Sequence, residues 1–423
     1  MTADDLVSIR RELHRHPEPA WCEFFTTARL VDYLERRPLD ALYVGPDALS
    51  TQNRLAVPDD ETMREWYHRA REAGADEERL EELAGGHTGA VAVLERGHGP
   101  TVGLRVDIDG LPREESADPD HLPAAEGFRS ETGESMHACG HDAHAAIGIG
   151  VIDAIADSDF QGTLKVFFQP AEEVIGGGKA MAESSHVEDV DYLLAVHVGL
   201  DHPTGTVVSA VDGFLAVRHL EATIHGEPAH AGGHPEQGRN AIQAAAAGIQ
   251  NVYGIARHAD GGTRVNVGVV DAGSAANIIA ETAHLVCEVR GETTELMEYM
   301  TDRLETVLES AATMHDCSVT FDVGAEAPSA TSDEAIRERV ADVAAGVDGV
   351  DTVLDRDDLG GSEDATFLMR AVQQQGGKAC YVGVGTDHPG GHHTATFDVD
   401  EASIGHAVAV LAGTVERLAT DRP

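Results

Sequence analysis

The chain has 423 residues, of which 42% are hydrophobic, and 74 acidic residues against 30 lysines and arginines give a formal net charge of −44 at pH 7. That length allows one or two domains. No apolar run is long enough to span a membrane, so we expect neither a membrane-spanning segment nor a membrane as a partner. So negative a charge argues against nucleic acid as a partner.

The acidic residues are spread over the whole chain between apolar runs, which predicts a folded protein with a strongly negative surface. Our hypothesis is a halophilic cytoplasm, where salt screens the repulsion within such a surface. An ordinary acidic protein with basic partners is the alternative. The start "MTADDLVSIRREL" lacks an apolar signal core, and the five cysteines contain no C-x-x-C pair, so we expect a cytoplasmic location and no disulfide framework.

Strands and helices are predicted to alternate in the first half of the chain. The helix-forming segments are 2–16, 26–37, 59–84, 143–156 and 176–183. The predicted strands are 89–95, 101–110, 163–169 and 191–200, the first two paired with each other. Nearly continuous apolar strands that alternate with helices predict an α/β fold with a mostly parallel sheet covered by helices.

The pattern changes near residue 213, where strands with one exposed face begin. The expected strands are 214–226, 263–273, 283–292 and 318–324, and the expected helices are 240–258 and 294–314. Helix–strand alternation then resumes, through 338–346, 365–374, 378–385 and 401–419. We therefore predict a discontinuous parallel-sheet domain, 1–212 and 325–423, with an inserted α+β domain, 213–324.

Residue types that bind metals follow several predicted strands. They are Asp107 and Asp109, Glu172 and Glu173, His197, and Asp387 with His392 and His393. Cys139 and His141 lie in "MHACGHDAHAA", in the expected loop before the next helix. Each has an ordinary explanation when taken alone: an aspartate caps a helix, a histidine or cysteine packs in a core. Because ligands gather beyond the carboxyl ends of the strands in open α/β sheets, their joint placement predicts a shared site.

A thiolate, several imidazoles and several carboxylates suit Zn, Mn, Ni or Co rather than Ca or Mg. Two divalent ions about 3.5–4 Å apart could polarise a carbonyl group and supply a hydroxide nucleophile. The adjacent glutamates of "PAEE" need not face the same way, so one could bind metal while the other serves as a general base.

The chain resembles the two-metal amidohydrolase and carboxypeptidase family, in the branch of aminoacylases, hippurate hydrolases and auxin-conjugate hydrolases. The segments that carry the resemblance are "IRRELHRHPEPAWCEF", "LRVDIDGLP", "MHACGHDAHAA", "FFQPAEE", "AVHVG", "HAGGHPEQGRNAI", "NVGVVDAGSAANIIA" and "HHTATFDVDE". Within that branch, "PAWCEF", "HAGGHPEQGRNA" and the insertion around residues 50–90 look most like aminobenzoyl-glutamate hydrolases of the A-subunit type. The resemblance implies a catalytic metal-binding domain with an inserted lid and dimerisation domain, and a homodimer or a second related subunit.

The resemblance also implies a role for each matching residue. Cys139, His141, Glu173, His197 and His393 match the metal ligands; His393 is preferred to His392 because it lies four residues before Phe397, as the family's ligand precedes its phenylalanine. Glu172 matches the general acid and base, and Asp109 an aspartate that orients groups of the metal site. Asp107, where distant relatives carry a ligand histidine, and Asp142 and His144 are expected to support the ligands or begin the helix.

Three residues of the inserted domain complete the expected site. His230 matches a histidine that stabilises the oxyanion, often from a partner subunit. Arg290 matches a residue that clamps the substrate carboxylate, with a surface ion pair as the alternative. Asn266 is a weaker candidate for substrate binding, and a structural role suits it better.

We therefore predict a metallo-amidohydrolase that holds two divalent ions and cleaves the amide bond of an N-acyl or N-aroyl amino acid. The alternatives are a general aminoacylase or dipeptidase, and a metal-binding homologue without catalysis, against which the intact "PAEE" argues. The sequence leaves open the native metal, the acyl group, the amino acid and the need for a second subunit.

Overall fold

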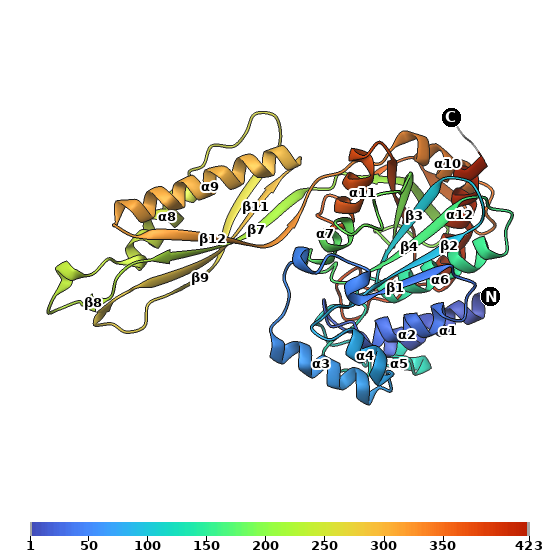
Figure 1. Cartoon of the computed structure of the whole chain (residues 1–423), viewed down its shortest axis with the longest axis horizontal. Coiled ribbons are helices and arrows are strands. Elements are labelled where there is room, and N and C mark those ends of the chain that lie inside the picture. Colours follow the sequence, from blue (N-terminus) through green and yellow to red (C-terminus); the bar gives the residue numbers. More distant parts are fainter. Residues whose placement is uncertain (1, 421–423) are drawn as a thin grey trace. The chain divides into compact units, whose positions relative to one another are not determined.

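A computed structural model describes residues 2–420, and the chain divides into two compact units. The first unit comprises Met1–Gly213, Ala330–Leu359 and Asp364–Pro423, and the second comprises Phe214–Ser329 and Gly360–Glu363. Figure 1 follows the chain through both units in the colours of the sequence. The role of the second unit as a lid and dimerisation domain stays a prediction.

The first unit is built on a mixed sheet in the order β1-β2-β4-β3-β5-β15-β6-β13, with β14 beside β6. Its strands are β1 (Ala41–Val44), β2 (Ala90–Glu95), β3 (Thr101–Asp107), β4 (Thr163–Gln169), β5 (Tyr192–Val198), β6 (Thr206–Asp212), β13 (Thr352–Leu354), β14 (Asp357–Asp358) and β15 (Lys378–Val384). Strands β4, β3, β5 and β15 at its centre run parallel. Strand β2 pairs antiparallel with β1 and β4, and β6 pairs antiparallel with β15 but parallel with β13 and β14. The mostly parallel central sheet is as predicted.

The predicted pairing of residues 89–95 with 101–110 is wrong, because β4 lies between β2 and β3. The short connection after β2 passes the beginning of β4: the Arg96 N–H donates to the Gly162 carbonyl at 2.8 Å, and the Thr163 N–H to the Pro100 carbonyl at 3.0 Å. Strand β4 is buried over almost its whole length, as is usual for a strand with a neighbour on each side.

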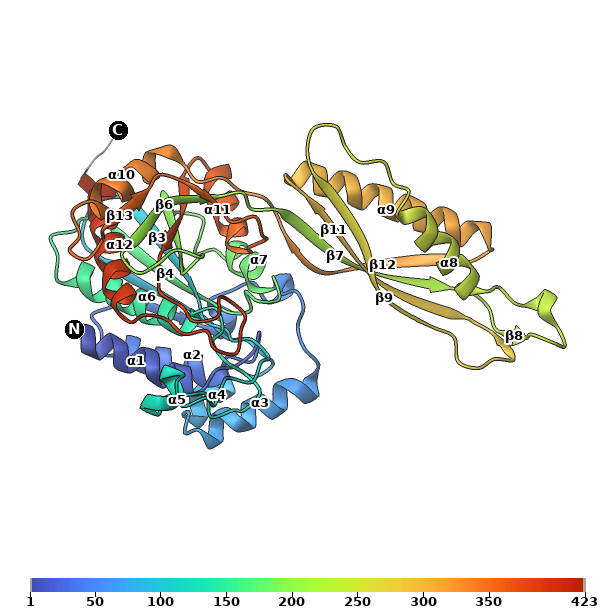
Figure 2. The ribbon, with the colours of Figure 1, turned by 180° about the vertical axis from the view of Figure 1, so that it is seen from behind.

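Helices cover both faces of this sheet, which confirms the predicted α/β class. On one face a single apolar core includes residues of α1 (Ala3–Arg15), α2 (Phe24–Leu34), α6 (His141–Ala156), α10 (Glu334–Ala344) and α12 (Ala402–Thr420). Figure 2 shows several of these helices from behind. On the opposite face lie α7 (Gly177–Ala182) and α11 (Ala365–Gln374).

The predicted helical segment 59–84 forms two helices, α3 (Asp60–Glu72) and α4 (Glu77–Glu82), which pack against α2 through Met63, Trp66 and Leu80. A short helix, α5 (Leu122–Glu126), and 3₁₀ turns at Gly45–Asp47 and Thr51–Asn53 complete the first unit. None of the helices in the described part of the chain is long and apolar enough to cross a membrane.

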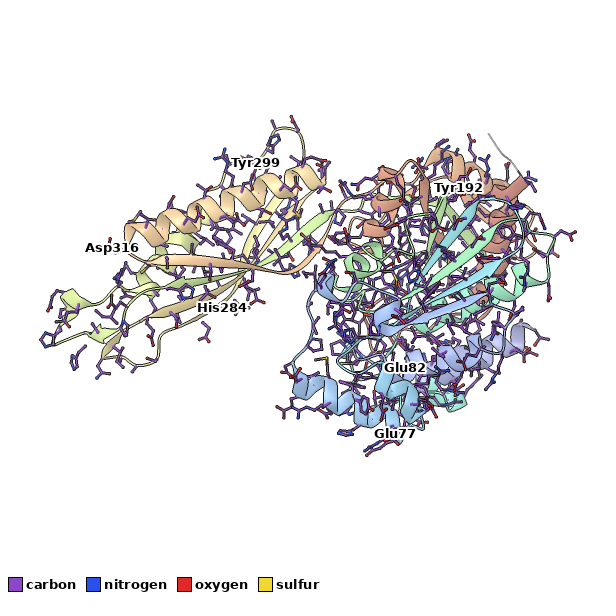
Figure 3. All side chains as sticks on the ribbon, viewed as in Figure 1. Glu77, Glu82, Tyr192, His284, Tyr299 and Asp316 are labelled. Carbon is purple, nitrogen blue, oxygen red and sulfur yellow. The ribbon has the colours of Figure 1, made fainter. Side chains whose placement is uncertain are left out.

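The second unit is an antiparallel sheet, in the order β12-β7-β11-β9, with two helices packed on it. Its elements are β7 (Ala216–His225), β8 (Ala229–His230), a 3₁₀ turn (Pro235–Gln237), α8 (Ala241–Val252), β9 (Thr263–Ala272), β10 (Ile278–Ile279), β11 (Thr282–Gly291), α9 (Thr294–Met314) and β12 (Ser318–Ala327). Figure 3 labels Tyr299 on α9 and His284 on β11. Helix α8 ends before the predicted residue 258, because Tyr253 and Gly254 close a turn in which the Gly254 N–H donates to Asn251.

Candidate metal centre

The candidate site lies at the carboxyl edge of the parallel strands of the first unit. Asp107 and Gln169 end β3 and β4 and are paired in register, and Glu172 comes after Pro170 and Ala171 in the turn that follows β4. His197 lies near the end of β5, beside Gly383 of β15, and the segment with His392 and His393 follows β15. The structure therefore brings the polar residues after these strands to one edge of the sheet.

A glycine turn places Cys139 and His141 at this edge. Gly140 has φ +85°, and a Cβ atom there would lie 2.6 Å from Cγ2 of Val198, so glycine is required by both conformation and space. His141 is the first residue of α6, not a loop residue as predicted, because the helix begins directly after this glycine.

The five residues predicted as ligands lie close together. Cys139 Sγ is 3.4 Å from His197 Nε2 and 3.5 Å from His393 Nε2. The Glu173 carboxylate completes the group, with Oε1 3.8 Å from His141 Nε2 and Oε2 3.6 Å from His393 Nε2. Triads of possible ligand atoms within 4.8 Å of one another overlap here, among them Cys139–His141–His197, Cys139–Glu173–His393, His141–Glu172–Glu173 and Asp107–His141–His144. Their overlap provides enough donors for more than one ion.

Two of these histidines have one ring nitrogen held by an oxygen and the other directed at the cluster. His197 Nδ1 donates to the Val198 carbonyl at 2.7 Å, and His141 Nδ1 lies 3.2 Å from Oδ1 of Asp109. Within the described residues, the buried Nε2 of His141 has no hydrogen-bond partner. The contact of Nδ1 with an oxygen is the usual support of an imidazole that binds a metal through its other nitrogen. The donor set therefore fits a divalent ion of the transition series.

The charges around the cluster also suit a cation. Burial disfavours the charged form of His141, yet Asp107, Asp109 and Glu173 together raise its pKa to about 10. Burial and the neighbouring His144 and His392 hold the pKa of His197 well below its usual range. The carboxylates that retain a proton on His141 would equally favour a divalent ion in its place.

His392 has a supporting position that the sequence did not predict. Its Nε2 accepts the Leu200 N–H at 3.1 Å, so Nδ1 carries the proton and donates to Cys139 Sγ at 3.3 Å. Burial, then His388 and His393, lower the pKa of His392 to about 3, which keeps the ring neutral. The adjacent His393, with φ +59°, also directs Nε2 at Cys139 Sγ and in addition faces Glu173. Two neighbouring histidines look alike in the sequence, and only these contacts distinguish them.

Asp109, Asp107 and His144 surround the cluster. Asp109 Oδ1 contacts His141, and Oδ2 accepts the Glu173 N–H at 3.0 Å. Asp107 is paired with His144 and, at 2.8 Å, with the buried Arg105. His144 Nε2 accepts the Val198 N–H at 2.9 Å, so both of its ring nitrogens have partners. The position of all three is consistent with support of the ligands.

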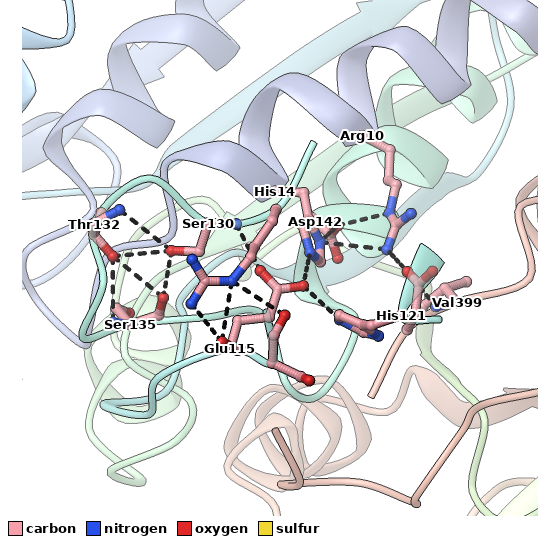
Figure 4. Close-up of polar contacts among 12 residues, drawn as sticks. Arg10, His14, Glu115, His121, Ser130, Thr132, Ser135, Asp142 and Val399 are labelled. Atoms are coloured by element: carbon pink, nitrogen blue, oxygen red, sulfur yellow. Dashed lines mark hydrogen bonds and ion pairs between the residues drawn. The ribbon is translucent and has the colours of Figure 1, made fainter. Parts of the chain in front are cut away.

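Asp142, in contrast, is directed away from the cluster, into the network drawn in Figure 4. Its Oδ2 accepts Arg10 Nε at 2.7 Å and lies 2.8 Å from His14 Nδ1, both on α1. Arg10 also binds Asp398, in the segment that follows His393. Asp142 thus lies in the first turn of α6, as its helix-start alternative expected, and its carboxylate contacts a distant helix.

His230, Asn266 and Arg290 lie in the second unit. His230 is exposed on β8, and its Nδ1 accepts the N–H groups of Gly232 and Gly233. Asn266 on β9 accepts a hydrogen bond from the Tyr253 hydroxyl at 3.0 Å. Arg290 on β11 makes two contacts with Glu288, at 2.7 and 3.0 Å, which is the ion pair that the sequence left open as the alternative.

A thiol, imidazoles and carboxylates at the edge of a parallel sheet, next to a second glutamate, define the centre of a metal-dependent hydrolase. The chain belongs to the peptidase family M20/M25/M40, whose sequence model matches residues 103–417. This confirms the predicted family and the predicted class of metallo-amidohydrolase.

Comparison with known proteins gives full-length relatives. The chain is 41% identical over 415 residues to indole-3-acetyl-aspartic acid hydrolase of Enterobacter agglomerans, covering 97% of this chain and 95% of the relative. It is 40% identical over 417 residues to the A subunit of p-aminobenzoyl-glutamate hydrolase from Escherichia coli (strain K12), with the same coverage. The crystal structure of an aminobenzoyl-glutamate utilization protein from Klebsiella pneumoniae superposes with a TM-score of 0.84 at 34% identity, covering 98% of this chain and 96% of that one.

Proposed function

We propose that the protein hydrolyses the amide bond of an N-acyl or N-aroyl amino acid with the help of two divalent metal ions. The observation that carries the proposal is the pair Glu172–Glu173 at the end of β4, of which Glu173 faces His141 and His393 while Glu172 lies within the same cluster. The names of the relatives supply the substrate class, since each hydrolase named is one of an acyl amino acid.

The ligands of the proposal are Cys139, His141, Glu173, His197 and His393. Divalent ions bound by these residues would polarise the amide carbonyl and lower the pKa of water. The thiolate and imidazole content favours Zn, Mn, Co or Ni, and their identity stays open.

Glu172 acts as the general base in this proposal. It takes a proton from the attacking water and returns it to the amine as the C–N bond breaks, so one carboxylate serves both steps. It is 9% exposed and lies beside His141 and Glu173. His230 is proposed to donate to the developing oxyanion, and Arg290 to bind the substrate carboxylate after it releases Glu288.

Assay over a panel of amides tests this proposal. The purified protein, with Mn²⁺ or Zn²⁺ in KCl buffer, should release free amino acid from p-aminobenzoyl-glutamate, indole-3-acetyl-aspartate or N-acetyl amino acids. Esters of unrelated alcohols should not be hydrolysed. A preference for small acyl groups would favour the general aminoacylase. Bound metal without hydrolysis of any member of the panel would favour the homologue without catalysis.

A further inference from the structure

Glu23 is a buried glutamate to which neither the sequence motifs nor the proposed mechanism assigns a task. It precedes α2 directly, is 0% exposed, and occupies the N-cap position of that helix. A carboxylate at an N-cap normally accepts N–H groups of the first turn. Here Glu18 accepts them instead, from Phe25 at 2.8 Å and from Thr26 at 2.9 Å. The carboxylate of Glu23 is therefore available for another partner.

That partner is the backbone immediately before the proposed general base. Glu23 Oε1 accepts the Ala171 N–H at 2.8 Å, and Oε2 accepts the hydroxyl of the buried Thr88 at 2.6 Å. Ala171 has φ +57°, a left-handed conformation that a residue with a side chain keeps only where its surroundings hold it. The hydrogen bond from the Ala171 N–H to Glu23 is such a constraint.

A second buried carboxylate holds the other side of Glu172. Asp109 Oδ2 accepts the Glu173 N–H at 3.0 Å. The turn then closes on itself, because the Ile175 N–H donates to the Glu172 carbonyl at 2.7 Å and the Gly176 N–H to the Ala171 carbonyl at 2.9 Å. The residues before and after Glu172 are thus both fixed through their amides, which leaves mainly the side-chain torsions of Glu172 to move.

Burial, and then the charge of Asp109, raise the pKa of Glu23 well above its ordinary range. Two carboxylates are thus placed near one another in the interior, an arrangement unfavourable for stability alone.

We propose that Glu23 is a positioning residue for hydrolysis: through the amide of Ala171 it holds the backbone of Glu172 so that the Glu172 carboxylate can reach the attacking water. The inference rests on the proposed function of Glu172. A misplacement of about 1 Å at a reacting group can cost about 100-fold in rate, so loss of this contact should appear in kcat.

The experiment compares Glu23→Ala, Glu23→Gln and Glu18→Ala in the full chain, with Glu172→Gln in parallel. Glu18→Ala is the matched control, because it also removes a buried carboxylate with two hydrogen bonds from the same segment, yet leaves Ala171 untouched. Each variant is assayed well below its own Tm, its bound Mn²⁺ is measured by elemental analysis, and hydrogen exchange is followed by mass spectrometry in peptides that cover residues 168–176.

Glu23→Ala should lower kcat by about 100-fold with KM and bound metal little changed, and should speed exchange in residues 168–176. Glu23→Gln retains an oxygen that accepts the Ala171 N–H, so it should restore most of the rate. Glu18→Ala should lower Tm but keep kcat and the exchange of this peptide.

The inference is overturned if Glu23→Ala keeps kcat while Glu172→Gln is inactive, or if Glu18→Ala loses as much rate as Glu23→Ala. Activity that persists in Glu172→Gln would instead overturn the proposed function. Should the wild-type protein hydrolyse no amide, the exchange measurement still decides whether Glu23 holds this turn.

Discussion

At the scale of the residue, metal binding depends on which nitrogen of each histidine carries a proton. His392 receives the Leu200 N–H on Nε2 and presents its own N–H to the sulfur of Cys139. A donor towards a thiolate supports a ligand, whereas a metal ligand must present a lone pair. His393 directs Nε2 at both Cys139 Sγ, at 3.5 Å, and the Glu173 carboxylate, at 3.6 Å, a position in which a neutral ring can present a lone pair to a metal. The two adjacent histidines should therefore respond differently to replacement.

His393→Ala should lower the bound metal from two ions per chain towards one, because a direct ligand is lost. His392→Ala should keep two ions but weaken binding by about 10- to 100-fold, as the loss of an outer hydrogen bond typically does. Titration of the chelated protein with Co²⁺, followed by absorption and calorimetry, measures both quantities. The reverse pattern, with one ion in His392→Ala and two in His393→Ala, would exchange the two assignments.

At the scale of the element, the sequence predicts where the strands lie and end better than it predicts which strands pair in the sheet. Apolar runs with Asp107, Glu172 and His197 at their ends indicate a parallel sheet with a site at its edge. The insertion of β4 between β2 and β3 leaves no local sequence signal, since all three strands share the same almost wholly buried pattern. Strand β6, which pairs antiparallel with β15, was also not predicted.

Long-range polar partners were equally beyond prediction. Asp142 pairs with Arg10, 132 residues earlier, and Glu23 accepts from Ala171, 148 residues later. No periodicity within one element encodes such a contact. For Asp142, the sequence indicated the position at the start of α6 but not the partners on α1.

The turn before α6 gives a test at this scale. Gly140→Ala should lower the free energy of unfolding by about 2 kcal/mol or more and weaken metal binding, because the new Cβ meets Val198 and φ is positive. Gly133→Ala is the control, since Gly133 has φ +75° but no atom within 4 Å of the position that a Cβ would take. It should cost only about 1 kcal/mol and leave metal binding intact. Equal effects of the two replacements, measured by urea unfolding and metal titration, would show that close packing at Gly140 has no part in the site.

Helix α1 makes stability depend on pH through His14. Burial and Arg10 oppose its charge, but Asp142 and Glu115 raise the pKa of His14 to about 9 from an unfolded value near 6.5. A raised pKa stabilises the fold fully below pH 6.5, and this contribution is lost as the pH rises through 9. The loss should be a few kcal/mol, at most about 3 to 4, from about 1.4 kcal/mol per pH unit. Urea unfolding of the chelated protein between pH 6 and 10 should show this decline and a flatter profile in His14→Gln; an identical profile in that variant would remove His14 as its source.

At the scale of the whole molecule, the net charge of −44 sets the conditions under which the protein is stable. Repulsion among exposed carboxylates opposes the compact state, and salt shortens its range to about 3 Å at 1 M. We predict that the free energy of unfolding rises steadily between 0.1 and 3 M KCl, measured by thermal and urea unfolding. Full stability in dilute buffer, with no gain in KCl, would contradict the halophilic hypothesis.

The proposed function requires that the whole molecule hydrolyses its substrate only with metal bound and with Glu172 as the general base. The most direct measurement is hydrolysis of an acyl amino acid by the chelated protein and by the chelated Glu172→Gln variant as Mn²⁺ or Zn²⁺ is restored. We predict that the wild type regains full activity at two ions per chain, and that the variant binds both ions but turns over about 10²- to 10⁴-fold more slowly. Hydrolysis by the metal-free protein, or a rate in Glu172→Gln equal to that of the wild type, would contradict this mechanism.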